Sequence, residues 1–208
     1  GANVKVMAIK GNFDDCQTAV KNIFSDVATN VLLKEKGVIL SSANSMNFGR
    51  LAPQITYYFS AYADLISSGE IKLGDKINFV VPTGNFGNIL AGYIAKKMGL
   101  PVGKLVCASN SNNILTDFLN TGVYDRNRQF HTTISPSMDI LISSNLERLL
   151  YELSGKDDKT VCEYMNALAS EGKYTVSDEI KDKIKEEFYG GCASDKETLE
   201  TIGETFEK

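Results

Sequence analysis

The stretch that decides the fold is INFVVPTGNFGN, residues 77–88. Residues 77–81 are rich in apolar and β-branched side chains, which is typical of a strand buried on both faces of a parallel sheet. The turn 82–88 follows directly, and apolar residues at helical spacing continue from it until Gly99 and Pro101 end the helix. The stretch therefore predicts strand, glycine-containing turn and helix in succession, which is the repeating unit of an α/β fold.

The same alternation of apolar runs and amphipathic stretches continues on both sides. Short apolar runs predict strands over 4–9, 38–40 and 105–108. Apolar residues three and four apart predict helices over 12–24, with Asn12 as a possible N-cap, and over 51–65 and 114–119. We therefore expect an α/β fold in three layers, a parallel sheet with helices on both faces.

Beyond Ser154 the sequence pattern changes, and no further strand is predicted. Charged stretches with helical spacing occupy 157–168, 177–188 and 197–208. We expect an α/β domain over 1–153 and a helical C-terminal tail, 154–208, as a peripheral part of the same domain. The chain opens without Met and ends within a helical pattern, so we expect a piece of a longer protein.

Composition and charge exclude several classes of protein. With 43% hydrophobic and 23% charged residues, the 208-residue chain is neither disordered nor collagen-like. Its net charge of -4 argues against a nucleic-acid partner, and no apolar run approaches the ~18 residues of a membrane helix. Four scattered cysteines and a single His predict no metal site, and free thiols in a reducing cytoplasm.

The strongest chemical signal is the glycine loop, residues 84–88. Gly84 and Gly87 let backbone N–H groups turn towards a ligand, and the helix that follows favours an anion at its N-terminus. Thr83 and the loop asparagines can add side-chain hydrogen bonds. The loop is neither a Walker loop nor G-x-G-x-x-G. It predicts a phosphate cradle, and the alternative is a plain tight turn between strand and helix.

A second polar segment, SSANSMNFGR at residues 41–50, precedes the long helix. Its Ser, Asn and Arg side chains could grip a second anion, with Arg50 binding in a bidentate manner. The alternative is ordinary N-capping by Ser45 or Asn47, with Arg50 in solvent. Of the remaining candidates, His131 is interpreted as a surface residue, Asp139 as a helix cap, and the aromatic residues at 57–62 as core.

Several motifs together resemble threonine synthase, although no single one is specific. The resemblance covers about the first 150 residues closely and the tail more loosely. It rests on NFDDCQ (12–17), SANSMN (42–47), RLAPQI (50–55), YYF (57–59), PTGNFGN (82–88), GLP (99–101) and SPSMDI (135–140). The resemblance implies a tryptophan-synthase-β-like fold, of which this chain is the central part of the large domain. It also implies an enzyme that uses pyridoxal 5'-phosphate (PLP) to convert O-phosphohomoserine and water to threonine and phosphate.

The resemblance also implies roles for particular residues. The loop around the cofactor phosphate corresponds to Gly84, Asn85, Phe86, Gly87 and Asn88. The residues that correspond to the grip on the substrate phosphate are Asn44, Ser45 and Arg50, with Asn88 as a further contact. The two anion-binding segments suggested by the residues thus match the two phosphates that the family binds, one on the cofactor and one on the substrate.

The chain also departs from the family. The family's Schiff-base lysine lies in a Phe-Lys-Asp context, and no lysine here has that context, so no catalytic residue is assigned. The chain alone is expected to be inactive and, with uncovered sheet edges, to self-associate. Two alternatives stay open: another PLP enzyme of the same fold, such as a serine or threonine dehydratase or a cysteine synthase, and a non-catalytic phosphate-ligand binding module.

Overall fold

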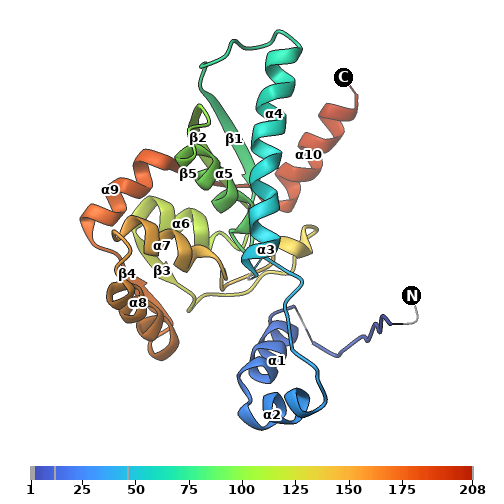
Figure 1. The fold of residues 1–208 in the computed structure, drawn as a ribbon. Helices are drawn as coiled ribbons and strands as arrows, with labels where there is room; N and C mark the ends of the chain where they lie inside the picture. The colour runs from blue at the N-terminus through green and yellow to red at the C-terminus, as the bar shows by residue number, and fades with distance from the viewer. Residues whose placement is uncertain (1–2, 12, 46, 208) are drawn as a thin grey trace. The chain divides into compact units, whose positions relative to one another are not determined.

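The computed structural model describes residues 3–11, 13–45 and 47–207 (Figure 1). The chain divides into two compact units, residues 1–42 and residues 43–208. In the first unit, helix α1 (Phe13–Ser25) packs against helix α2 (Val27–Glu35). Asp26 caps α2 by accepting a hydrogen bond from the N–H of Thr29. The predicted N-cap Asn12 lies outside the described residues.

The strands expected over 4–9 and 38–40 are wrong. Both stretches are irregular, and Val6 and Ile39 are 92% and 89% exposed. A strand needs a neighbouring strand to satisfy its N–H and C=O groups. Neither stretch has such a neighbour in the part of the chain that the structure describes. An apolar run alone was therefore a poor guide to strand formation here.

The second unit is built on a three-stranded parallel sheet in the order β1-β2-β5. Its strands are β1 (Ile77–Pro82), β2 (Val102–Ser109) and β5 (Phe188–Cys192). Because the strands are parallel, their carboxyl ends meet at one edge of the sheet, the edge at which open α/β sheets bind ligands. The predicted α/β fold with a parallel sheet is confirmed.

The expectation that strands end near Ser154 is wrong. β5 pairs with β2, and β4 (Lys173–Thr175) pairs antiparallel with β3 (Val123–Asp125). The glycines of β5 weaken its strand signal, since glycine has low strand propensity. A Cβ at Gly190 would lie 3.0 Å from the backbone of Thr116, so glycine here allows a helix to pack closely against the strand.

Helices cover the sheet face that carries Leu105, Cys107 and Phe188, all of them buried. Packed on β1, β2 or β5 are α5 (Gly87–Lys97), α6 (Ile114–Thr121) and α9 (Asp178–Glu187). On the opposite face Val80 and Tyr189 are 68% and 62% exposed. The expectation that residues 77–81 are buried on both faces is therefore wrong, because β1 is an edge strand with one open face.

The helix predicted over 51–65 is interrupted. A short helix α3 (Phe48–Leu51) and a 3-10 turn η1 (Ala52–Gln54) lead into α4 (Ile55–Ser67), and the turn accommodates Pro53. Of its aromatic residues, Tyr58 and Tyr62 are core, whereas Tyr57 and Phe59 are exposed. The remaining elements are η2 (Pro136–Met138), α7 (Leu146–Leu153), α8 (Asp158–Ser170) and α10 (Asp195–Phe206).

Over the residues that the structure describes, no helix combines the length and apolar character that crossing a membrane would take.

Candidate functional site

The glycine loop lies at the carboxyl edge of the sheet, where β1 passes into α5. The N–H of Thr83 donates to the carbonyl of Ala108, so the pairing with β2 extends one residue past the strand. Phe86 follows with a left-handed backbone, φ 62°, and its side chain is buried against Phe188. This conformation costs a non-glycine residue about 1–2 kcal/mol. Packing of the Phe86 ring therefore holds the loop in a conformation that it would not adopt alone.

The loop carbonyls are bonded to a segment far along the chain. Gly84 O accepts a hydrogen bond of 2.9 Å from Ser143 Oγ, and Asn85 O accepts one of 2.8 Å from Asn145 Nδ2. In a trans peptide the N–H points away from the C=O. The N–H groups of Asn85 and Phe86 therefore point to the side opposite residues 143–145.

The loop N–H groups remain available to a ligand. Those of Asn85, Phe86 and Gly87 form no hydrogen bond with any residue that the structure describes. They open helix α5, whose dipole favours an anion at this end. Asn85 Oδ1 is buried without a partner among the described residues. Such an orphaned polar atom is expected to gain a partner when a ligand with a donor group binds.

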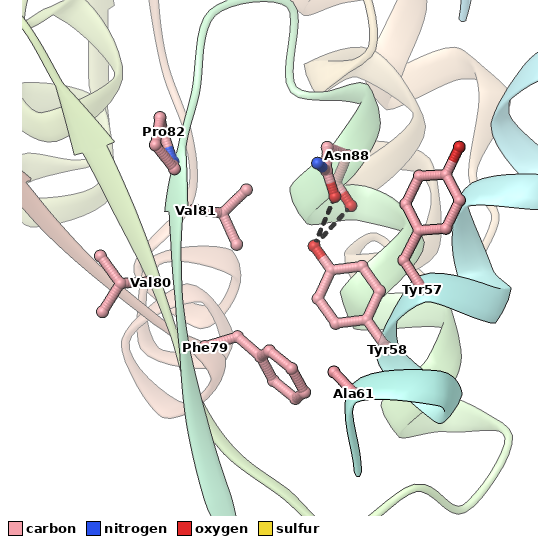
Figure 2. Close-up of a pocket in the computed structure, with 8 residues that line it drawn as sticks. All are labelled: Tyr57, Tyr58, Ala61, Phe79, Val80, Val81, Pro82 and Asn88. Atoms are coloured by element: carbon pink, nitrogen blue, oxygen red, sulfur yellow. Dashed lines mark hydrogen bonds between the residues drawn. The ribbon is translucent and has the colours of Figure 1, made fainter. Parts of the chain in front are cut away.

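Asn88 ends the loop beside α4. The Tyr58 hydroxyl donates to Oδ1 and to the backbone oxygen of Asn88, at 2.8 and 2.9 Å (Figure 2). Burial raises the pKa of Tyr58 well above its usual value, so this hydroxyl stays a donor. The Asn88 amide nitrogen is thus left as the donor end of the side chain. An apolar groove of about 250 Å³ between α4 and the edge of β1 leads to it (Figure 2).

The structure brings Ser45 to the glycine loop. A Cβ at Gly87 would lie 2.5 Å from Ser45 Oγ, so the two segments approach as closely as glycine permits. Asn145 Nδ2 donates to Ser45 Oγ at 2.9 Å, and Arg148 donates to Ser45 O at 2.8 Å. The two polar segments that the sequence singled out separately therefore lie side by side.

The other residues of the second segment are less closely engaged. Asn47 is the N-cap of α3 and accepts from the N–H of Gly49, as the capping alternative expected, but Ser45 is not a cap. Arg50 is exposed, and its guanidinium forms no hydrogen bond or ion pair with the described residues. Asn44 is also exposed. The geometry thus connects Ser45, but not Arg50, to the loop.

Residues 143–148, Ser-Ser-Asn-Leu-Glu-Arg, were missed by the sequence reasoning. Their density of polar side chains before a helix resembles that of residues 41–50, and this was the available signal. Asn145 is fully buried, and Arg148 is half-buried one turn later in α7. The hydrogen bonds of this segment reach residues that are 60 and 100 positions away, which no local pattern reveals.

The prediction that Asp139 caps a helix is wrong. Its carboxylate is buried and accepts hydrogen bonds from Asn110, from Asn112, and from both the N–H and the hydroxyl of Thr133. This network fixes the segment whose backbone lies against Gly84, where a Cβ would be 3.0 Å from Ser137 O. Asp139 therefore holds the segment against which Gly84 of the loop packs.

Neither the His131 side chain nor the cysteines show features of a catalytic or metal-binding group. His131 is exposed, as expected of a surface residue. All four cysteines are free, and burial raises the pKa of the Cys107 thiol to about 11. No cluster of three or more His, Cys, Asp or Glu side chains suited to a metal ion occurs among the described residues.

Comparison with known proteins identifies relatives over almost the whole chain. No family model matches. The chain is 47% identical over 202 residues to human threonine synthase-like 1, covering 96% of this chain and 27% of that protein. It is 43% identical to threonine synthase from Pseudomonas aeruginosa, covering 99% of this chain and 42% of the relative. The chain thus spans well under half the length of these relatives.

Solved structures of threonine synthases resemble this chain in fold as well as in sequence. PLP-bound threonine synthase from Brucella melitensis superposes with a TM-score of 0.83 at 43% identity, over 96% of this chain and 40% of that one. The yeast enzyme gives a TM-score of 0.82 at 41% identity, over 99% of this chain and 40% of that one. Sequence and fold therefore agree that this chain is homologous to a segment of the threonine synthases.

Proposed function

We propose that the chain forms the phosphate-binding part of a PLP-dependent threonine synthase. The observation that carries this proposal is the hydrogen bonding of the glycine loop. Its carbonyls accept hydrogen bonds from Ser143 and Asn145, while three successive N–H groups at the start of α5 stay available. The homology to threonine synthases supports a phosphate ligand over a plain turn.

The residues fit the phosphate of PLP. Gly84, Asn85, Phe86, Gly87 and Asn88 would hold it through backbone N–H groups and the Asn88 amide nitrogen. The absence of a Cβ at Gly87 lets Ser45 approach the loop. The buried Oδ1 of Asn85 is an acceptor and would need a donor group of the ligand other than its phosphate. PLP, when bound, supplies electron withdrawal from the substrate's α-carbon. The loop's part is to fix where the cofactor lies.

A second phosphate, that of O-phosphohomoserine, would lie at Asn44, Ser45 and Arg50, with Asn88 as a further contact. Asn145 Nδ2 can only donate, so Ser45 Oγ accepts from it and keeps its own proton for a ligand. The exposed Arg50 guanidinium is available for bidentate binding. These residues would bind and orient the substrate.

The chain by itself should form no threonine. Catalysis with PLP needs a lysine that binds the cofactor and moves protons, and no lysine here lies in the family's Phe-Lys-Asp context. We also propose that 1–153 and 154–208 are parts of one domain. The pairing of β5 with β2 supports this for residues 43–208, which form one compact unit. A cytoplasmic location completes the proposal, and cell fractionation is its test.

The activity is best tested in a chimera. The chain would replace the matching 42% of the Pseudomonas aeruginosa enzyme, and the chimera would be assayed for phosphate release from O-phosphohomoserine. Formation of threonine and phosphate is expected. In the Arg50→Ala chimera, KM for the substrate should rise while PLP content stays unchanged.

Other outcomes would support the alternatives. A chimera that binds PLP but deaminates serine or threonine would favour a dehydratase, and one that makes cysteine and acetate from O-acetylserine and sulfide would favour a cysteine synthase. Binding of phosphate ligands without turnover would favour the non-catalytic module.

A further inference from the structure

We propose that Asn145 is a positioning residue, which holds the glycine loop and Ser45 together so that both face the phosphates. The inference rests on the proposed function for the ligands, but the contact between loop and Ser45 can be measured without any ligand. Asn145 would touch neither cofactor nor substrate, and it would act through the groups to which it is bonded.

The orientation of the Asn145 amide follows from its partners. Asn85 O can only accept, so it must face Nδ2, at 2.8 Å. Arg148 can only donate, so it must face Oδ1, at 2.7 Å. Ser45 Oγ, 2.9 Å from Nδ2, is then the acceptor of the remaining amide proton. Both ends of the fully buried amide are therefore used, and they join three segments.

The location of Asn145 makes this use of the side chain unexpected. It is the N-cap residue of α7, a position at which asparagine normally accepts a hydrogen bond from the helix backbone. Its side chain forms no such bond and leaves α7 without a side-chain cap. Although asparagine is suited to capping, the Asn145 amide binds the loop and Ser45 instead. This points to a role outside its own helix.

Arg148 reinforces the same connection. One turn along α7, its guanidinium donates to Asn145 Oδ1 and also to Ser45 O at 2.8 Å. Charge-assisted hydrogen bonds are stronger than neutral ones. The pair thus fixes Ser45 through both its side chain and its backbone, while Asn145 fixes the loop through Asn85 O.

Asn145 would influence phosphate binding through two hydrogen-bond donors, the Phe86 N–H and the Ser45 hydroxyl. The bond to Asn85 O sets the peptide plane that directs the Phe86 N–H outward. The bond to Ser45 Oγ leaves the serine hydroxyl proton as the donor for a ligand. If the amide donor is lost, Ser45 Oγ loses its bond to Asn145, and Asn85 O keeps only the 3.2 Å bond from the Asn145 backbone N–H, so the side chain no longer joins the loop to Ser45.

Asn145→Asp separates this role from a structural one. Aspartate keeps an oxygen that can accept from Arg148 but loses the amide donor, so a role confined to α7 predicts an unchanged contact between the loop and Ser45. The positioning role predicts a different result, because a carboxylate oxygen cannot donate to Asn85 O or Ser45 Oγ. Asn113→Ala is the matched control, since Asn113 also begins a helix without capping it and bonds to neither segment.

The measurement is an NMR comparison of the full 208-residue chain and its variants. In the unsubstituted chain and in Asn113→Ala, a cross-relaxation contact should join Gly87 Hα to Ser45 Hβ. In Asn145→Asp this contact should disappear, and the dissociation constant for inorganic phosphate at the loop amides should rise about tenfold or more. Should Asn145→Asp fail to fold, Arg148→Met takes its place, and the same contact should weaken.

The outcomes separate the two claims. A retained contact together with a phosphate affinity within twofold of that of the unsubstituted chain would overturn the positioning role. If the unsubstituted chain binds no phosphate at the loop, the proposed function fails, whereas the contact between Gly87 and Ser45 still decides the inference by itself.

Discussion

Replacing Gly87 with alanine tests the closest approach in the site. The added Cβ would lie 2.5 Å from Ser45 Oγ and 2.7 Å from Ser45 Cβ. Rotation of the serine side chain relieves only the first contact, because its Cβ is fixed to the backbone. Ordinary van der Waals contact begins at 3.4 Å, so the backbone at Ser45 must retreat by about 0.7 Å (3.4 minus 2.7).

The magnitude follows from three contributions to the free energy of unfolding. Overpacking of this kind costs about 1–3 kcal/mol. Weakening the hydrogen bond between Asn145 and Ser45 costs about 0.5–1.5 kcal/mol more. Alanine is about 0.5–1 kcal/mol more favourable than glycine within a helix. We therefore expect Gly87→Ala to lose about 0.5–4 kcal/mol, although the substitution raises helix propensity.

The assay is urea denaturation, with phosphate binding followed in parallel. Gly203→Ala is the control, because nothing lies within 4 Å of a Cβ at this helical glycine, so it should gain stability by about 0.5–1 kcal/mol. Gly92→Ala, whose Cβ would lie 2.6 Å from the Tyr58 ring, should lose stability by overpacking the core. A Gly87→Ala protein that is as stable as Gly203→Ala and binds phosphate normally would refute the close approach of loop and Ser45.

Three further predictions concern other parts of the second unit. Because burial raises the pKa of Cys107 from 9.0 to about 11, its contribution to stability is complete below pH 9 and is lost as pH rises towards 11, by up to about 2–3 kcal/mol. Denaturation at several pH values should show a larger loss in the unsubstituted chain than in Cys107→Ala, in which the buried Tyr58 still lowers stability above pH 10. Asp139→Asn should lower the free energy of unfolding by about 2–4 kcal/mol, since it replaces a buried acceptor of several hydrogen bonds, and an unchanged urea midpoint would contradict the network. If the open sheet face drives self-association, Val80→Lys together with Tyr189→Lys should shift the chain towards monomer in light scattering, whereas an unaltered mass would exclude that face.

Sequence reasoning succeeded where a local pattern has a local cause. The elements β1, α5 and β2 follow from apolar spacing and from glycines that end helices, and the glycine loop lies between strand and helix as predicted. One local detail differed: Phe86, not a glycine, adopts the left-handed conformation of the loop. Packing of its buried ring against Phe188 outweighs the local backbone preference.

What the sequence could not reveal depends on distant contacts. Residues 4–9 look like a strand but have no pairing partner among the described residues, whereas β5 contains two glycines and is a strand because β2 lies beside it. Asn145 looks like a helix cap, yet its amide binds Asn85 and Ser45. Asp139 was likewise misjudged because its partners, Asn110 and Asn112, lie almost thirty residues earlier.

The proposed function depends on binding of the cofactor's phosphate by the glycine loop. The most direct test titrates the 208-residue chain with pyridoxamine 5'-phosphate and, separately, with pyridoxamine, while the backbone amide signals are followed by NMR. Neither compound carries an aldehyde, so adducts with surface lysines do not interfere. We expect the phosphorylated compound to move the Asn85, Phe86 and Gly87 amide signals, weakly and reversibly, and pyridoxamine to leave them in place. Equal binding of the two compounds, or shifts confined to the groove beside Tyr57, would contradict the proposed function.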